Sequence, residues 1–340
     1  FDDVPMQSSV GLEEIVKSYW EVWWASTRPQ PQLVVTSNNP RLKEWAQSRM
    51  KRVDLLVHFP PDPKHNRRLS ELFEFDNRLF EWFSSEYLKR WKGEVSQEDE
   101  LALARELEGT LPVVVFPGDP EAPDAVFPNN VFATARGKLL VGRMRHEVRR
   151  REATNAAVRR HFEERLGYAT VDLSQRDDLV AELTGPLVVD HARAIGYCGL
   201  SGRCDRRGAA AMHELFGLAL TFVFELGSDE YHTNVVTSVL AGRALLIHEG
   251  SFVDPEVPRA IASVYGERVL RLSDAEKCAF AGNCLALGED EVWMSTRAEA
   301  ALRAESRRAL ESWGFTIRSV PLDEIEKAGG SLRCCVTEIF

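Results

Sequence analysis

The stretch Leu187-Val-Val-Asp-His-Ala-Arg-Ala-Ile-Gly-Tyr-Cys198 contains two short apolar runs separated by a few turn residues, and a helical pattern follows it over about 206–218. Short runs rich in β-branched and aromatic residues are typical of strands. Longer stretches with apolar residues at a spacing of three or four are typical of helices. The stretch therefore predicts two strands and a helix, which one more strand would complete as a ββαβ unit.

The same layout recurs at three further places beyond residue 110. Two short runs precede a helical stretch each time: 113–116 and 138–144 before about 149–166, 235–240 and 243–248 before about 255–265, and 284–287 and 291–294 before a helix that starts near 296. A unit this short cannot bury its own sheet, so several must pack around a shared centre. Small groups of strands with helices outside predict an α/β or α+β fold.

The last of these helices has the clearest boundaries. Thr296 and Glu299 have the spacing of a capping box, and Gly314 is placed to end the helix. Beyond it, residues 332–339 predict a final strand, which must pair with something earlier in the chain.

The first hundred or so residues differ from the rest. They hold six of the eight tryptophans, and the clearest helical pattern among them spans about 66–91. The run 53–57 predicts a buried strand, and the acidic stretch 94–108 predicts an exposed helix.

Composition excludes several classes of partner. The chain has 340 residues with 42 Lys and Arg against 52 Asp and Glu, a formal net charge of −10. A net-negative chain repels phosphate backbones, so we expect no nucleic-acid partner. No apolar run approaches the roughly 20 residues of a membrane helix, and the N-terminus lacks the blocks of a signal peptide. We therefore expect a cytoplasmic protein that binds no membrane, with its oligomeric state left open.

The six cysteines all lie beyond residue 197 and do not form the pattern of a disulfide framework. Cys198/Cys204 and Cys278/Cys284 are spaced more widely than paired zinc ligands usually are. The sequence also lacks a glycine-rich phosphate loop. We therefore expect neither a metal nor a cofactor.

Three polar residues lie next to predicted strands: Glu182, His232 and Cys334. A catalytic cysteine needs a base and an orienting carboxylate, and residues at strand entrances can meet at one end of a barrel-like sheet. A buried structural thiol is the plain alternative for Cys334, and spacing alone does not decide between them.

Five strings of the chain occur together, in order, in one family. They are Asp124-Ala-Val-Phe-Pro-Asn-Asn130, Glu182-Leu-Thr-Gly-Pro-Leu-Val-Val-Asp190, Leu200-Ser-Gly-Arg203, Tyr231-His-Thr-Asn-Val235 and Gly329-Gly-Ser-Leu-Arg-Cys334. With them the chain resembles the guanidino-group-modifying hydrolases and amidinotransferases, the penteins, and most of all their citrulline hydrolase and arginine dihydrolase branch. The resemblance covers about residues 110–340.

The resemblance implies a five-bladed α/β propeller of ββαβ units with pseudo-fivefold symmetry. It implies a single catalytic domain over 1–340, with a helix- and Trp-rich extension or insertion within about 1–110. The fifth unit would come from pairing the C-terminal strand with N-terminal strands near Val53.

The resemblance also implies roles for individual residues. Cys334 would be the nucleophile, His232 the general acid and base, and Glu182 the carboxylate that binds the substrate's terminal nitrogen. Arg203 would hold the α-carboxylate of the substrate, as a bidentate partner can. Asp124 would add negative charge, and Arg333 beside the thiol would help to lower its pKa. Cys335 falls where relatives have an apolar residue.

The most informative departure from the family is a pair of amides. Deiminases of this family have carboxylates where Asn130 and Asn234 stand, and two carboxylates suit a guanidinium cation. Amides can donate to a carbonyl oxygen, which carboxylates cannot. This indicates a site that takes a ureido group such as that of citrulline, as substrate or as bound intermediate. The plain alternative is that Asn129 and Asn130 only shape a turn.

We therefore expect a cysteine hydrolase of linear carbon–nitrogen bonds that converts citrulline or arginine to ornithine, carbon dioxide and ammonia. It would act on a small amino-acid substrate through a covalent thioether intermediate. The alternatives are an amidinotransferase, a deiminase with citrulline-type products, and a non-catalytic pentein scaffold.

Overall fold

The computed structural model describes residues 97–109, 111–116, 122 and 124–340. All of them belong to the second of the chain's two units, Leu88–Phe340. The expected Trp-rich helices and the strand near Val53 lie outside the described residues. Among the residues described, no helix is long and apolar enough to cross a membrane.

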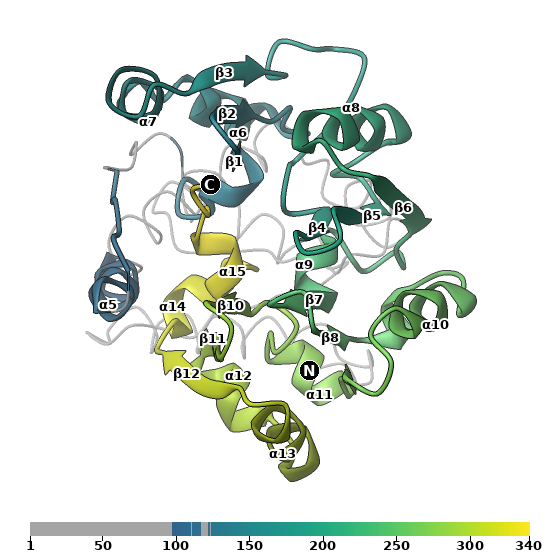
Figure 1. Ribbon diagram of the computed structural model, residues 1–340. Coiled ribbons are helices and arrows are strands. Elements are labelled where there is room, and N and C mark those ends of the chain that lie inside the picture. Colours follow the sequence, from purple (N-terminus) through teal and green to yellow (C-terminus); the bar gives the residue numbers. More distant parts are fainter. Residues whose placement is uncertain (1–96, 110, 117–121, 123) are drawn as a thin grey trace, which may run out of the picture. The chain divides into compact units, whose positions relative to one another are not determined.

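Four sheets of three strands form the described part of the chain (Figure 1). In each sheet the first two strands are antiparallel and the third is parallel to the second. The strands are β1 (Phe132–Ala135), β2 (Lys138–Val141) and β3 (Ala169–Asp172); β4 (Leu187–Asp190), β5 (Ile195–Leu200) and β6 (Leu220–Glu225); β7 (Thr237–Leu240), β8 (Ala244–Ile247) and β9 (Val269–Arg271); and β10 (Leu285–Leu287), β11 (Glu291–Ser295) and β12 (Thr316–Val320).

Helical segments connect the second strand of each sheet to the third, as a parallel pair requires. They are α6 (Glu147–Arg150), η3 (Arg151–Thr154), α7 (Ala156–Arg160) and η4 (His161–Arg165) in the first unit, α8 (Arg206–Phe216) in the second, η5 (Glu249–Ser251) and α10 (Glu256–Ser263) in the third, and α12 (Thr296–Ala301) and α13 (Ala304–Ser312) in the fourth. The ββαβ layout and the α/β class expected from the sequence are confirmed for these four units.

The remaining helices are α5 (Gln97–Glu108), η2 (Pro128–Asn130), α9 (Thr233–Val236), α11 (Asp274–Cys278), α14 (Asp323–Glu326) and α15 (Leu332–Cys335). The helix expected over 94–108 is confirmed as α5, but it is not wholly exposed, because Leu103 and Leu107 are buried in a hydrophobic cluster.

Three expectations about elements are wrong. The run 113–116 forms no strand, and Val114 and Val115 are exposed; the first strand of its unit is β1 instead. The helix after β11 is capped by Ser295, whose side chain accepts from the Ala298 N–H. It is also interrupted, since α12 and α13 are separate helices. Gly314 does follow the second one, with φ of +81°.

The C-terminal strand expected over 332–339 is also wrong. Residues Leu332–Cys335 form the short helix α15, and the residues after it have no strand assignment. This C-terminal tail, residues 336–340, lies beside β1 through side-chain bonds. Thr337 Oγ1 donates to the Phe132 carbonyl over 3.3 Å, and the Phe340 N–H donates to Thr134 Oγ1 over 2.9 Å. Hydrogen bonds of the Thr134 and Thr337 hydroxyls therefore join the tail to β1 in place of the backbone ladder that a strand would form.

The first strand of each sheet lies innermost. Strands β4 and β7 contact each other, as do β7 and β10, and Figure 1 shows helices α7, α8, α10 and α13 at the periphery. Residues of β1, β4, β7 and β10, together with the C-terminal tail, line a cavity of about 260 Å³. The inner strands therefore surround a common centre.

Hydrophobic clusters join neighbouring units. Leu140 of the first unit shares a buried cluster with Leu187 and Met212 of the second, and Leu246 of the third shares one with Val292 of the fourth. This is the packing around a shared centre that short units require.

A glycine at the start of α8 tests this packing. A Cβ at Gly208 would lie 1.9 Å from the Val180 carbonyl oxygen, whereas a Cβ at Gly202 would meet nothing within 4 Å. Helix propensity alone would favour Gly208→Ala by about 1 kcal/mol. We expect Gly208→Ala to lower the free energy of unfolding by about 1–3 kcal/mol through overpacking, and Gly202→Ala to leave it nearly unchanged, as measured by urea denaturation. A stabilised Gly208→Ala protein would contradict this account.

Candidate active site

The polar residues of the site lie just before the inner strands. One backbone bond recurs in three units: Gly142 N–H to Val131 O, Gly199 N–H to Pro186 O, and His248 N–H to Val236 O. The three acceptors are therefore structurally equivalent. Glu182 and His232 stand at the same distance in sequence before the acceptors of their units, so their positions are equivalent. Asn129, Thr184 and Asn234 form a second set of equivalent positions in the same way. The ββαβ layout thus delivers these side chains to the same end of the inner strands.

Glu182 is fully buried and accepts polar contacts from three residues. His232 Nε2 lies 2.9 Å from its Oε2, Arg203 Nη1 lies 3.2 Å from the same oxygen, and the Arg145 backbone N–H donates to Oε1 over 3.1 Å. Burial alone would raise the pKa of this carboxyl. The hydrogen bond and charge of His232, with the charge of Arg203, outweigh burial and lower the pKa to about 2. Glu182 is therefore a carboxylate at neutral pH.

His232 directly precedes α9, and its side chain is 2 % exposed. Burial lowers the pKa of the imidazole in spite of the Glu182 carboxylate. A neutral ring that donates its Nε2 hydrogen to Glu182 carries its lone pair on Nδ1. Among the described residues, Nδ1 is buried with no hydrogen-bond partner. The ring therefore has a basic nitrogen available for proton transfer.

Cys334 lies in α15 and is buried. Burial raises the pKa of its thiol, although the Ser331 and Asn283 contacts and the charges of Arg333 and Arg149 act in the opposite direction. The Asn283 amide donates to the sulfur over 3.3 Å, and Asn234 Oδ1 lies 3.9 Å from it.

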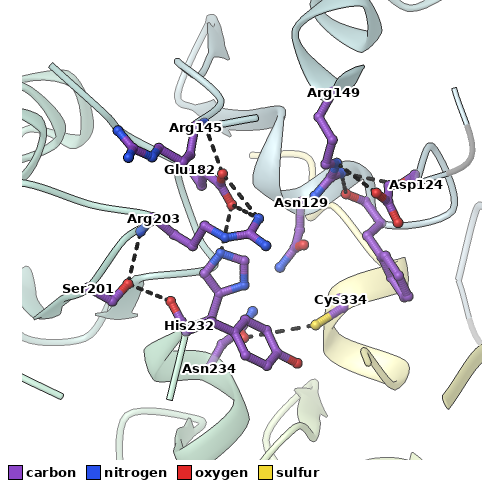
Figure 2. Close-up of polar contacts among 12 residues, drawn as sticks. Asp124, Asn129, Arg145, Arg149, Glu182, Ser201, Arg203, His232, Asn234 and Cys334 are labelled. Atoms are coloured by element: carbon purple, nitrogen blue, oxygen red, sulfur yellow. Dashed lines mark hydrogen bonds and ion pairs between the residues drawn. The ribbon is translucent and has the colours of Figure 1, made fainter. Parts of the chain in front are cut away.

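Asn234 links the thiol to the other two residues. It stands in the same short segment as His232, and its side-chain amide donates to the Thr184 carbonyl over 3.0 Å, two residues after Glu182 in the chain. Figure 2 shows Glu182, His232, Asn234 and Cys334 in one cluster. The structure therefore brings the three expected catalytic residues together from segments far apart in the sequence.

Two adjacent amides line the same site. Asn129 is 0 % and Asn130 3 % exposed. Both polar atoms of the Asn129 side chain, and Oδ1 of Asn130, are buried without hydrogen-bond partners among the described residues. Because buried polar groups are nearly always paired, these atoms point to a ligand. A Cβ at Gly185 would lie 2.7 Å from Asn130 Oδ1 and 2.8 Å from the His232 ring, so this position has room for glycine only.

The other expected binding residues are placed differently. Arg203 contacts Glu182 and is about a quarter exposed. Asp124 forms an ion pair with Arg149 at 3.9 Å, and Arg149 also donates to the Phe127 carbonyl. Arg333 donates to the Val336 carbonyl and to Glu338 over 3.0 Å, so its guanidinium is engaged with the C-terminal tail. Arg333 thus contributes charge to the thiol without a direct contact to the Glu182 cluster.

Sequence reasoning missed three participants. From the sequence alone, Asn129 is expected only as a turn residue, and no role is predicted for Arg145. No role is predicted for Asn283 either, although it stands immediately before the run 284–287, and other site residues also stand shortly before the first strand of their unit. The repeated layout was the signal that could have found it.

Comparison with known proteins identifies related chains. The family model described as N,N dimethylarginine dimethylhydrolase, eukaryotic, matches residues 95–340. No curated protein matches the sequence.

Solved structures share the fold. The N-terminal domain of ArgZ, an arginine dihydrolase from the ornithine-ammonia cycle in Cyanobacteria, is similar in a form covalently bound to a reaction intermediate, with a TM-score of 0.64 and 22 % identity over 72 % of this chain and 86 % of that one. Unliganded AgrE has a TM-score of 0.63 and 24 % identity over 71 % of this chain and 34 % of that one. A dimethylarginine dimethylaminohydrolase adduct with S-methyl-L-thiocitrulline has a TM-score of 0.56 and 18 % identity over 71 % and 87 %.

The burial of the Cys334 thiol predicts how its reactivity depends on pH. Because burial raises the pKa of Cys334 above the ordinary thiol value of 9.0, the thiolate fraction of the unliganded protein must still be growing at pH 9. We expect alkylation of Cys334 by iodoacetamide, followed by peptide mass mapping that separates it from Cys335, to accelerate through and beyond pH 9. An alkylation rate that is already constant from pH 7 upward would show a low thiol pKa and contradict the raised pKa of Cys334.

Proposed function

The chain belongs to the eukaryotic N,N dimethylarginine dimethylhydrolase family, and from this premise we propose that it is a cysteine hydrolase of a ureido or guanidino amino acid. It is a hydrolase acting on carbon–nitrogen bonds other than peptide bonds, and a member of the pentein guanidino-modifying enzymes. The observation that carries the finer proposal is the cluster of Glu182, His232 and Cys334 beside buried, unpaired amides.

The first half-reaction uses the thiol and the imidazole. The Cys334 thiol loses its proton to His232 Nδ1, and the sulfur attacks the planar carbon of the substrate. His232 then gives that proton to the departing nitrogen, which leaves as ammonia. Glu182 fixes the tautomer and ring orientation of His232, and its charge stabilises the imidazolium. A covalent thioether intermediate on Cys334 results.

The second half-reaction uses water. His232 Nδ1 removes a proton from water, the oxygen attacks the same carbon, and the carbon–sulfur bond breaks. From arginine this gives a ureido product, citrulline. A second passage through both halves releases another ammonia and a carbamate, which loses carbon dioxide to leave ornithine. Arginine and two waters thus give ornithine, carbon dioxide and two molecules of ammonia.

The amides support acceptance of the ureido stage. Asn129, Asn130 and Asn234 are buried and neutral. A pair of carboxylates in their place would favour the guanidinium cation over the neutral ureido group. The unpaired Asn129 Nδ2 can donate to a ureido oxygen, and its Oδ1 can accept from a ureido or guanidino N–H. Glu182 keeps one negative charge in the site, so the site also accepts arginine.

The α-carboxylate of the substrate needs a cationic partner. We propose Arg203 for the α-carboxylate, since only its Nη1 is engaged with Glu182. Arg145 is exposed, and its backbone N–H donates to Glu182, which places Arg145 close to Arg203 at the exposed side of the site. Asp124 acts through its ion pair with Arg149, and Arg333 contributes its charge to the thiol.

A second candidate rests on the family match. A substrate with a dimethylated guanidino nitrogen would release dimethylamine in place of the first ammonia and leave citrulline. The chemistry at Cys334 would be the same, and the difference would lie in whether citrulline is released or processed further.

We also propose the finer features of the fold and location. The four ββαβ units around a common centre, with the C-terminal tail beside β1, support a five-bladed propeller. The six cysteines, none of which is in a disulfide, favour the reducing cytoplasm.

Product analysis tests the proposal. We expect arginine and citrulline to yield ornithine, with two and one equivalents of ammonia respectively, and Cys334→Ala to abolish both reactions. N,N-dimethylarginine should release dimethylamine if the second candidate also holds. Ammonia release that survives Cys334→Ala would end the nucleophile assignment, and an arginine reaction that stops at citrulline would refute the double hydrolysis. Dependence on an added amine would indicate an amidinotransferase.

The amide at position 129 tests the reading of the substrate. Asn129→Asp supplies a carboxylate, which favours the guanidinium and cannot donate to the ureido oxygen. We expect citrulline to accumulate when this variant acts on arginine. We also expect kcat/KM for citrulline to fall by at least about tenfold, the equivalent of roughly 1.4 kcal/mol. Asn155→Asp is the matched control, because Asn155 caps α7 through its side-chain oxygen, away from the site. Unchanged citrulline hydrolysis by Asn129→Asp would contradict the assignment.

A further inference from the structure

Asn283 is a fully buried amide that no part of the proposed reaction uses. Its side-chain oxygen accepts from the Ser331 N–H over 3.2 Å and from the Cys334 N–H over 3.3 Å. Its backbone carbonyl accepts from the Arg333 N–H over 3.3 Å. One residue therefore holds the turn that carries the thiol at three points.

The two side-chain hydrogens of Asn283 have different partners. The shorter contact, 2.8 Å, goes to the Asn234 backbone carbonyl. The same nitrogen, Nδ2, also lies 3.3 Å from the Cys334 sulfur and 3.4 Å from Asn234 Oδ1, so its second hydrogen can be donated to either. Since the side-chain oxygen is bonded to two backbone N–H groups, an exchange of the amide oxygen and nitrogen would leave donors facing donors. The network therefore fixes an N–H, and not an oxygen, toward the sulfur.

The sulfur faces opposite influences from two asparagines. Asn234 Oδ1, at 3.9 Å, can accept the hydrogen of the neutral thiol but repels a thiolate. The Asn283 N–H can donate to a thiolate, and a hydrogen bond to a charged acceptor is stronger than one to a neutral acceptor. Asn234 therefore favours the resting thiol, and Asn283 favours the form that attacks.

We propose that Asn283 is a catalytic residue that stabilises the Cys334 thiolate through its side-chain N–H. This rests on the proposed function, since it assigns Asn283 to the nucleophile of that reaction. The same residue also fixes the position of the sulfur through the turn at 331–334.

Other groups also act on the thiol and must be separated from Asn283. The positive charges of Arg333 and Arg149 favour the thiolate. Burial raises the pKa of the partly buried Tyr231 phenol and the charge of Cys334 raises it further, while the phenol hydroxyl donates to the Gly329 carbonyl. None of these groups is changed by a substitution at Asn283, so the effect of its N–H can be isolated.

The test is a thiol titration without substrate, read as the absorbance at 240 nm that Cys334→Ser removes. Asn283→Asp replaces the donor by a carboxylate of the same shape, and Asn283→Leu removes the donor without adding charge. We expect alkylation of Cys334 at pH 8 to slow by at least about tenfold in Asn283→Asp, which corresponds to one pKa unit, and by a smaller factor in Asn283→Leu.

Ser331→Ala is the matched control, because the Ser331 hydroxyl bonds Glu326 and not the thiol. It alters the same turn and should leave the thiol titration unchanged. Folded Asn283 variants whose Cys334 titrates as in the parent protein would overturn the proposal. Because no substrate is present, this outcome is distinct from failure of the proposed function.

A second measurement keeps the proposal testable if the Asn283 variants do not fold. With ¹⁵N-asparagine labelling of the unaltered protein, the Asn283 side-chain proton should shift downfield as Cys334 ionises, and this shift should be absent in Cys334→Ser. A side-chain resonance that does not follow the thiol would overturn the proposal.

Discussion

A carboxylate without access to water organises the site. Glu182 is fully buried, and a buried charge is tolerated only when it is paired and hydrogen-bonded. Its partners come from three separate segments: His232, Arg203 and the Arg145 backbone. Removing a partner from such a pair usually costs about 3–5 kcal/mol. The need to satisfy this one charge therefore holds the histidine in a single tautomer and orientation beside the thiol.

The layout of the fold could be read from the sequence because it depends on local patterns. Alternating runs and helical spacing located β4, β5 and α8 almost to the residue, and the same signals identified the other three units. The errors arose where tertiary contacts decide. The Val114–Val115 run has strand-like residues, but the structure assigns no strand there. The C-terminal residues form α15, where Asn283 accepts the backbone N–H groups of Ser331 and Cys334.

The site could be predicted only in part for the same reason. Glu182, His232 and Cys334 were identifiable from their positions next to strands and from family motifs, and the structure places them together. The contact of Arg203 with Glu182, the engagement of Arg333 by Glu338 and the burial of Asn129 depend on packing between units. No local pattern reports which of two adjacent asparagines is left without partners. In the proposed function, these amides distinguish a site for a ureido group from a site for a cation.

Covalent capture on the thiol tests the central claim most directly. The unaltered protein is mixed with arginine or citrulline, quenched rapidly with acid during turnover, and digested, so that an intermediate bound to the thiol is captured before water releases it. The account predicts an adduct of the amidino or carbamoyl product on the peptide that contains Cys334, located on that residue by fragmentation. An adduct on Cys335 or on another cysteine, with Cys334 unmodified, would contradict it.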